Sequence, residues 1–207
     1  MEILTIGSME DIKTAVRLLN VPEFSKIFLL CGPIPLRREP PGFATLFKVV
    51  IGQQVSVASA AAIWSRLEDA GLSRQSQVAR ASVEELAVIG LSRPKIRYAH
   101  ALSQNLIDYD SLTILPDVEV LDILTQITGI GRWTAQVYAL TALGRTDVFP
   151  YGDLALQEAT RLAFNLPTRP DAKKMSNLAQ EWAPWRAVAA RLLWAYYKHL
   201  KLQKEKI

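Results

Sequence analysis

The chain has 207 residues, of which 50% are hydrophobic and 21% charged, and its mean hydropathy is +0.12. This composition excludes a disordered chain and is typical of a globular protein large enough to bury its own core. The net charge of +4, from 24 basic and 20 acidic residues, is compatible with a polyanionic partner but does not require one.

Cysteine and histidine usage excludes several cofactor classes. The chain has one cysteine, Cys31, and two histidines, His100 and His199. A single cysteine forms no intramolecular disulfide and cannot supply the thiolates of an iron–sulfur cluster, and so few ligands argue against structural zinc. The first residues are acidic where a signal peptide is basic, and no apolar run approaches the ~18 residues that span a bilayer. We expect a protein without a membrane segment, in the cytosol of a bacterium or archaeon or in the nucleus of a eukaryote.

Turn and cap signals divide the chain into segments with helical spacing of apolar residues. An irregular N-terminal region, with a weak strand signal at residues 2–6, is closed by Pro40-Pro41-Gly42. Residues 43–70 then predict two helices that meet near Gly52-Gln53-Gln54. The sequence predicts an all-α protein of nine to eleven helices. Further helix starts are predicted at Ser82, Ser92, Pro116, Arg132, Asp153, Pro170 and Pro184, and helix ends at Gly90 and Gly144.

The segment from Ile127 to Gly131 (ITGIG) joins two of these helices through a very tight turn. Two glycines around one apolar residue allow the backbone to turn sharply and to approach a neighbour closely. Amides at the start of the following helix then face outward, where the partial positive charge of the helix end suits a phosphate. An ordinary connection between two helices has the same pattern, so both interpretations remain open.

Asp153 follows Pro150-Tyr151-Gly152 and precedes a helical segment. A carboxylate at this position has an obvious structural role as an N-cap. The helix dipole and the nearby amides also favour its ionised form, which suits a group that faces a developing cation. The structural and the chemical role are compatible with each other.

Two motifs together resemble the helix-hairpin-helix (HhH-GPD) DNA glycosylase superfamily: residues 129–135 (GIGRWTA) and residues 150–154 (PYGDL). Within it, the chain is most similar to the 3-methyladenine DNA glycosylase II (AlkA-like) branch. The resemblance extends to residues 50–56 and 185–194, and it covers residues 43–200.

This resemblance implies an all-α fold of two helical lobes with the active site in the cleft between them. Residues 1–44 would pack with the C-terminal lobe, residues 45–145 would form the lobe that carries the hairpin, and residues 146–207 would form the C-terminal lobe. The implied activity is that of a monofunctional DNA N-glycosylase of base excision repair. It would act as a monomer on double-stranded DNA and excise alkylated purines of the 3-methyladenine and 7-methylguanine type.

The resemblance also assigns roles to single residues. Asp153 falls on the catalytic aspartate, and Trp133 and Trp194 fall on aromatic residues that line the base pocket. Gln54 falls where relatives insert a wedge into the minor groove. No cofactor is implied other than a structural Na⁺ or K⁺ ion. The expected DNA contacts at the hairpin are Gly129, Ile130, Gly131, Arg132 and Thr134, with Arg145 nearby, and the carbonyls of Thr125, Ile127 and Ile130 would hold the ion.

Two positions depart from the family pattern. Thr128 stands where the hairpin usually has proline, which makes the turn less rigid. Trp133 stands where bifunctional relatives carry the lysine that forms a Schiff base with the opened sugar. Without that amine, strand cleavage by covalent catalysis has no nucleophile, so we expect no AP lyase activity.

Several of these assignments have a structural alternative. Trp133 could belong to a buried stripe with Val137 and Leu140, and Gln54 could be part of a polar junction between helices. Trp194 points away from the apolar stripe of its helix, which favours a position in a cleft. No charged group is evident in such a pocket, so its aromatic faces would attract a cationic base. The functional alternatives are a non-catalytic helix-hairpin-helix DNA-binding module and a glycosylase for another class of lesion.

Overall fold

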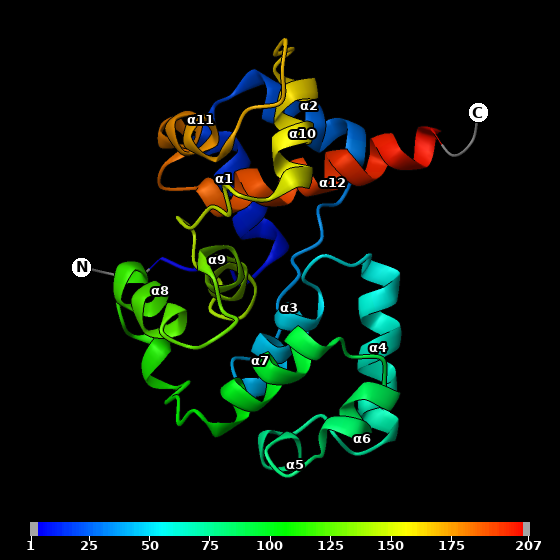
Figure 1. Cartoon of the computed structure of the whole chain (residues 1–207). Coiled ribbons are helices and arrows are strands. Elements are labelled where there is room, and N and C mark those ends of the chain that lie inside the picture. Colours follow the sequence, from blue (N-terminus) through cyan, green and yellow to red (C-terminus); the bar gives the residue numbers. More distant parts are fainter. Residues whose placement is uncertain (1–3, 205–207) are drawn as a thin grey trace. The chain divides into compact units, whose positions relative to one another are not determined.

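The computed structural model describes residues 4–204, and every element in this range is helical. It contains twelve α-helices and two short 3-10 helices, so the predicted all-α class is confirmed (Figure 1). Residues 2 and 3 of the predicted strand lie outside the described range. In the remainder of that segment only an isolated bridge forms, between Thr5 and Arg145. No helix between residues 4 and 204 is long and apolar enough to cross a membrane.

The chain divides into two compact units. We call the first the terminal unit, because it combines Met1–Arg38 with Gly144–Ile207, and the second the central unit, Glu39–Leu143. The boundaries expected from the sequence, at 44/45 and 145/146, lie a few residues further along the chain. The central unit is therefore an insertion in the sequence of the terminal unit.

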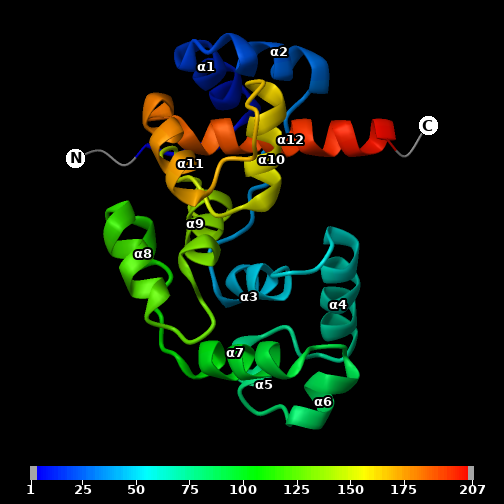
Figure 2. The ribbon, with the colours of Figure 1, turned by 45° about the horizontal axis from the view of Figure 1, so that its top comes forward.

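The terminal unit is built on α12, its long C-terminal helix. Both α2 and α10 pack against α12 (Figure 2). An aromatic cluster forms part of the core, in which the ring of Trp182 lies 5.1 Å from that of Phe24 and 5.3 Å from that of Phe149. Since Phe149 belongs to the loop before Asp153, the cluster ties that loop to the core. The helices of this unit are α1 (Met9–Leu19), α2 (Pro22–Cys31), α10 (Leu154–Ala163), α11 (Ala172–Leu178), η2 (Ala179–Trp182) and α12 (Arg186–Lys204).

The prediction of an irregular N-terminal region is wrong for the residues that form α1 and α2. The signal for α1 is a capping box, in which the Ser8 hydroxyl accepts from the amide of Asp11 at 3.1 Å. The Asp11 carboxylate accepts in return from the amide of Ser8 at 2.9 Å. Behind this cap, Ile12 and Val16 are buried at helical spacing, which gives the short helix an apolar face.

The central unit is built around α3, which packs against α4, α7 and α9. Leu46, Phe47 and Val50 of this helix are fully buried. The helices of the unit are α3 (Phe43–Ile51), α4 (Val57–Asp69), α5 (Gln75–Val78), α6 (Val83–Val88), α7 (Arg93–Gln104), η1 (Ser111–Thr113), α8 (Asp117–Thr125) and α9 (Arg132–Thr141).

Most of the predicted helix limits are confirmed. The two helices expected in residues 43–70 are α3 and α4, and their junction contains Gly52-Gln53-Gln54. Ser82 is the N-cap of α6 and forms the predicted capping box there. The end of α9 lies at Thr141 rather than at Gly144, and the short α5 has no counterpart among the predicted elements.

Candidate active site and hairpin

Asp153 is fixed at the N-terminus of α10 by the backbone of that helix. Its Oδ1 atom accepts hydrogen bonds from the amides of Ala155 at 2.9 Å and Leu156 at 3.0 Å, and the residue is half-buried. Its own amide donates to the carbonyl of Pro150 at 2.9 Å, which closes the preceding turn. The predicted N-cap is confirmed, and it gives the carboxylate a fixed orientation.

An ion pair holds the loop before Asp153 to α12, and the sequence analysis did not assign it. Arg186 Nε and Nη2 donate to the two carboxylate oxygens of Asp147, each at 2.7 Å. Beside this pair, the amide of Ala187 donates to the carbonyl of Thr146 at 2.9 Å. Two parallel hydrogen bonds between a guanidinium and a carboxylate fix geometry better than one contact does. Because Asp147 and Arg186 are 39 residues apart, no local pattern pairs them.

Trp194, on α12, is half-buried beneath an arginine from the N-terminal segment. The guanidinium carbon of Arg37 lies 5.4 Å from the centre of the Trp194 ring, in a cation–π arrangement. Burial lowers the pKa of Arg37, and the negative charge of Asp153 opposes that shift. A charged group therefore lies beside Trp194, where the sequence made none evident. Nothing in the local sequence connects residue 37 with residue 194.

Arg191 holds the backbone next to Arg37 against α12. Its Nε donates to the carbonyl of Leu36 at 3.0 Å, and its Nη1 donates to the carbonyl of Ala187 at 3.1 Å. The Arg191 side chain is almost completely buried, and this burial, together with the nearby positive charges of Arg38 and Arg37, lowers its pKa to about 10. The bond from Arg191 holds Leu36, the residue before Arg37, against α12.

The hairpin between α8 and α9 is a tight turn whose two glycines differ in their surroundings. Gly129 has φ +90°, and a Cβ there would overlap the ring of Tyr98 on α7. Gly131 is the N-cap of α9, with φ −84°, and a Cβ there would meet no atom within 4 Å. The first glycine therefore permits the turn, whereas the second leaves an open approach to the backbone.

Three of the residues expected to contact DNA, Ile130, Thr134 and Arg145, have their amide or side chain engaged or buried within the protein. The amide of Ile130 already donates to the carbonyl of Ile127 at 3.0 Å, and its side chain is buried. The side chain of Thr134 is buried, and that of Arg145 is only 1% exposed. These side chains lie in the protein interior instead. Gly129, Gly131 and the exposed Arg132 remain as candidates.

Gln53 links the junction between α3 and α4 to the hairpin. Its Nε2 donates to the carbonyl of Gly129 and to the hydroxyl of Thr134, both at 2.9 Å. Gln54, the next residue, is exposed and has a left-handed backbone with φ +57°. The resemblance places the wedge at Gln54 and implies no role for Gln53, yet Gln53 fixes the position of that junction relative to the hairpin.

Trp133 lies in the first turn of α9 and is half-buried. It belongs to the central unit, whereas Asp153 and Trp194 belong to the terminal unit. The assignment of Trp133 and Trp194 to one base pocket therefore stays a prediction.

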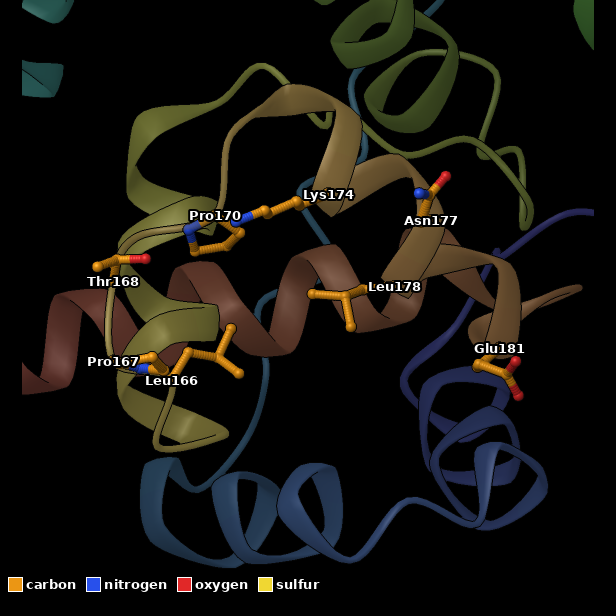
Figure 3. A pocket seen from close by; sticks show the side chains of 8 residues that line it. All are labelled: Leu166, Pro167, Thr168, Pro170, Lys174, Asn177, Leu178 and Glu181. Carbon is orange, nitrogen blue, oxygen red and sulfur yellow. The ribbon is translucent and has the colours of Figure 1, made fainter.

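A cavity of about 470 Å³ lies elsewhere on the terminal unit. Figure 3 shows that its lining comes from the segment after α10, from α11 and from η2, and includes Leu166, Lys174 and Glu181. None of the residues that the sequence analysis assigned to the site lines this cavity. The candidate active site is instead at Asp153 and Trp194, since Arg37 lies over the Trp194 ring and interacts with the charge of Asp153.

Comparison with known proteins agrees with the motifs. Residues 47–184 match the HhH-GPD superfamily of base excision DNA repair proteins, and this range contains both the hairpin and Asp153. The chain belongs to the HhH-GPD superfamily. The matched range does not include Arg37, Arg186 or Trp194.

Among relatives of this HhH-GPD protein is an alkylbase DNA glycosidase-like protein of Schizosaccharomyces pombe. It is 24% identical over 83% of this chain and 86% of the relative. A DNA-3-methyladenine glycosylase of the same yeast is 28% identical over 76% of this chain and 72% of the relative.

Solved structures of similar proteins have the same fold. A 3-methyladenine DNA glycosylase from the same yeast, in complex with abasic DNA, has a TM-score of 0.80 and 26% identity over 88% of this chain and 95% of that one. A DNA-3-methyladenine glycosidase from Bacillus halodurans has a TM-score of 0.75 and 28% identity over 98% of this chain and 95% of that one.

Proposed function

We propose that this HhH-GPD protein is a monofunctional DNA N-glycosylase that hydrolytically excises alkylated purines, of the 3-methyladenine and 7-methylguanine type, from double-stranded DNA. The observation that carries the proposal is Asp153, whose carboxylate is oriented by two amides of α10. The names of the relatives support the class of lesion.

The chemistry follows from the charge of the substrate. Alkylation at N3 or N7 leaves the purine positively charged, so its bond to the sugar is weak. The protein has to expose this nucleotide by flipping it out of the stack, which costs a few kcal/mol. As the base leaves, the sugar acquires positive charge, which the Asp153 carboxylate would stabilise while it orients or deprotonates the attacking water.

Replacing Asp153 by Asn tests the proposal without removing the helix cap, because an Asn side chain also accepts from the first-turn amides. We expect Asp153→Asn to bind DNA as the wild type does. Its rate of free-base release should be lower by a factor of about 100 or more. The measurement is single-turnover release of 7-methylguanine from a duplex.

The matched control is Asp171→Asn, since Asp171 is the exposed N-cap of α11 in the same unit. This control keeps the wild-type rate if the effect is specific. A rate within a few-fold of wild type for Asp153→Asn would remove Asp153 from catalysis. A wild type that binds duplex but releases no base would indicate a non-catalytic DNA-binding module.

Absence of AP lyase activity is also part of the proposal. Trp133 supplies no amine, and two candidate lysines are engaged elsewhere: Lys95 donates to the carbonyl of Ile51 at 2.6 Å and Lys48 pairs with Glu39 at 3.0 Å. We expect borohydride to trap no protein–DNA adduct, and strands to break only after alkali. A trapped adduct would show that one of the lysines forms an imine.

The proposed Na⁺ or K⁺ ion would bind carbonyl oxygens before and within the hairpin turn. These ligands fit such an ion, because all three are backbone carbonyl oxygens, those of Thr125, Ile127 and Ile130. The Ile127 carbonyl accepts one hydrogen bond, from the amide of Ile130, and keeps a second lone pair. When bound, the ion would add positive charge next to a DNA phosphate.

A further inference from the structure

The Arg37 guanidinium is a hydrogen-bond donor beside the candidate active site. It lies over the Trp194 ring at 5.4 Å and is close enough to Asp153 to be attracted by it. Among the described residues, the Arg37 side chain donates to no protein acceptor, and the residue is exposed although the Trp194 ring covers one face of its guanidinium. The N–H groups of Arg37 are therefore available to a base that stacks near Trp194.

The fold holds Arg37 in this position against two unfavourable effects. The residue has a left-handed backbone with φ +50°, which is uncommon for a residue with a side chain. Its charge is also close to that of Arg191, and the two positive charges repel each other. The bond from Arg191 to the Leu36 carbonyl fixes the backbone beside it. Strain of this kind persists where the surrounding structure imposes it, and such sites are often functional.

We propose that Arg37 determines lesion specificity by donating hydrogen bonds to the acceptor edge of an uncharged purine as that purine leaves. This inference rests on the proposed function and adds to it a residue that acts on the departing base. It predicts that the protein excises neutral purine lesions, such as hypoxanthine, and that Arg37 is needed for them.

The two classes of lesion place different charge on the leaving base. In both, the bond between C1′ and the purine N9 breaks, the electron pair stays on the base, and water adds to C1′. An N3- or N7-alkylated purine starts as a cation and leaves neutral. An uncharged purine leaves as an anion that afterwards takes a proton from solvent. The Arg37 guanidinium stabilises this developing negative charge by hydrogen bonds and keeps its own proton.

The same guanidinium gives no such advantage to a cationic lesion. It occupies one face of Trp194, so a cationic base cannot use that face for a cation–π contact. It also repels a second positive charge nearby. Arg37 should therefore shift the preference of the site toward uncharged bases without being required for cationic ones.

The test compares one neutral and one cationic lesion in the same duplex. Single-turnover release of hypoxanthine and of 7-methylguanine is measured for the wild type and for Arg37→Gln. We expect hypoxanthine release to fall by about 10- to 100-fold, the effect of losing a hydrogen bond to a charged group. The release of 7-methylguanine should stay the same or rise. Arg37→Lys keeps the charge but not the planar fork, so it should restore part of the loss.

The matched control is Arg38→Gln, which removes the same charge from the next residue and should leave the ratio of the two rates unchanged. Thermal unfolding of each variant shows whether it folds. Equal losses for both lesions would overturn the inference and indicate a phosphate contact or a structural role. A wild type that releases 7-methylguanine but no hypoxanthine would overturn it while the proposed function stands. Release of neither base would overturn both.

Discussion

The two hairpin glycines have separate roles, because only one of them is required by the fold. Gly129 has a positive φ and lies against the ring of Tyr98, so a side chain there strains the backbone and displaces an aromatic residue. Gly131 has an ordinary φ and open space around its Cβ position. The openness at Gly131 lets a phosphate approach the start of α9, where the helix dipole favours an anion.

This difference allows DNA binding to be tested apart from folding. We expect Gly131→Val to unfold at the wild-type temperature and to bind damaged and undamaged duplex about 10-fold more weakly, since it blocks a phosphate contact. Gly129→Ala should instead lower the free energy of unfolding by roughly 1–3 kcal/mol. Fluorescence anisotropy and thermal melts measure the two effects. Unchanged affinity in Gly131→Val would mean that the turn is only a connector.

The loop between α9 and α10 depends on one ion pair for its attachment to α12. Asp147 and Arg186 are about 30% exposed, and their two hydrogen bonds of 2.7 Å cross from the loop to the first residue of the helix. Asp153 lies six residues after Asp147 at the end of the same loop. Loss of the pair therefore affects the orientation of the carboxylate as well as stability.

We expect Arg186→Ala to lower the free energy of unfolding by about 1–3 kcal/mol, because it leaves the half-buried Asp147 carboxylate without its main partner. Base release should slow while affinity for duplex DNA stays near the wild-type value. A suitable control is Arg161→Ala, because Arg161 pairs with Glu158 at 2.7 Å with similar exposure, within α10. That pair connects neighbouring turns of one helix, so its loss should cost less than about 1 kcal/mol. Equal effects of the two variants on base release would contradict a role for Arg186 in holding the loop.

The whole molecule consists of a central unit inserted between the two parts of a terminal unit. The terminal unit needs both ends of the described chain, since α2, from one part, packs against α12, from the other. The central unit is continuous in sequence and has its own buried core around α3. A tyrosine in that core, Tyr138, gives the stability of the protein a dependence on alkaline pH.

Burial raises the pKa of Tyr138 from 10.0 to about 12, although a hydrogen bond from the Gly42 amide opposes the shift. Because the folded-state pKa is the higher one, this contribution to stability is complete below pH 10 and is lost as the pH rises toward 12. Burial also raises the pKa of Tyr109, whose ring centre lies 6.3 Å from that of Tyr138.

We expect the free energy of unfolding to fall between pH 10 and 12, and to fall less in Tyr138→Phe, by up to roughly 3 kcal/mol. At neutral pH the same variant should be about 1 kcal/mol less stable than the wild type, because the Gly42 amide loses its acceptor. Urea unfolding at a series of pH values gives both numbers. Parallel curves for the two proteins would show that the Tyr138 hydroxyl titrates alike in the folded and unfolded states.

Sequence alone determined the features that depend on neighbouring residues. The all-α class, the starts of α6 and α10, the junction after α3 and the position of the hairpin follow from caps and helical spacing, which act over a few residues. The two motifs also indicate the superfamily, and the capping box at Ser8 is a further local signal, for α1. Helix ends and burial were less predictable, since residue type does not show which polar side chains, such as Arg145, lie inside.

Only the tertiary structure decided which residues surround Asp153 and the hairpin. Asp147 meets Arg186 across 39 residues, Gln53 meets Gly129 across 76, and Arg191 holds Leu36 across 155. Arg37 reaches the face of Trp194 in the same way. Such pairs are set by how helices pack around a core, because packing brings side chains together without regard to their separation along the chain. No cap or periodic pattern encodes them, and those that involve Arg37 and Arg191 place positive charge beside Trp194.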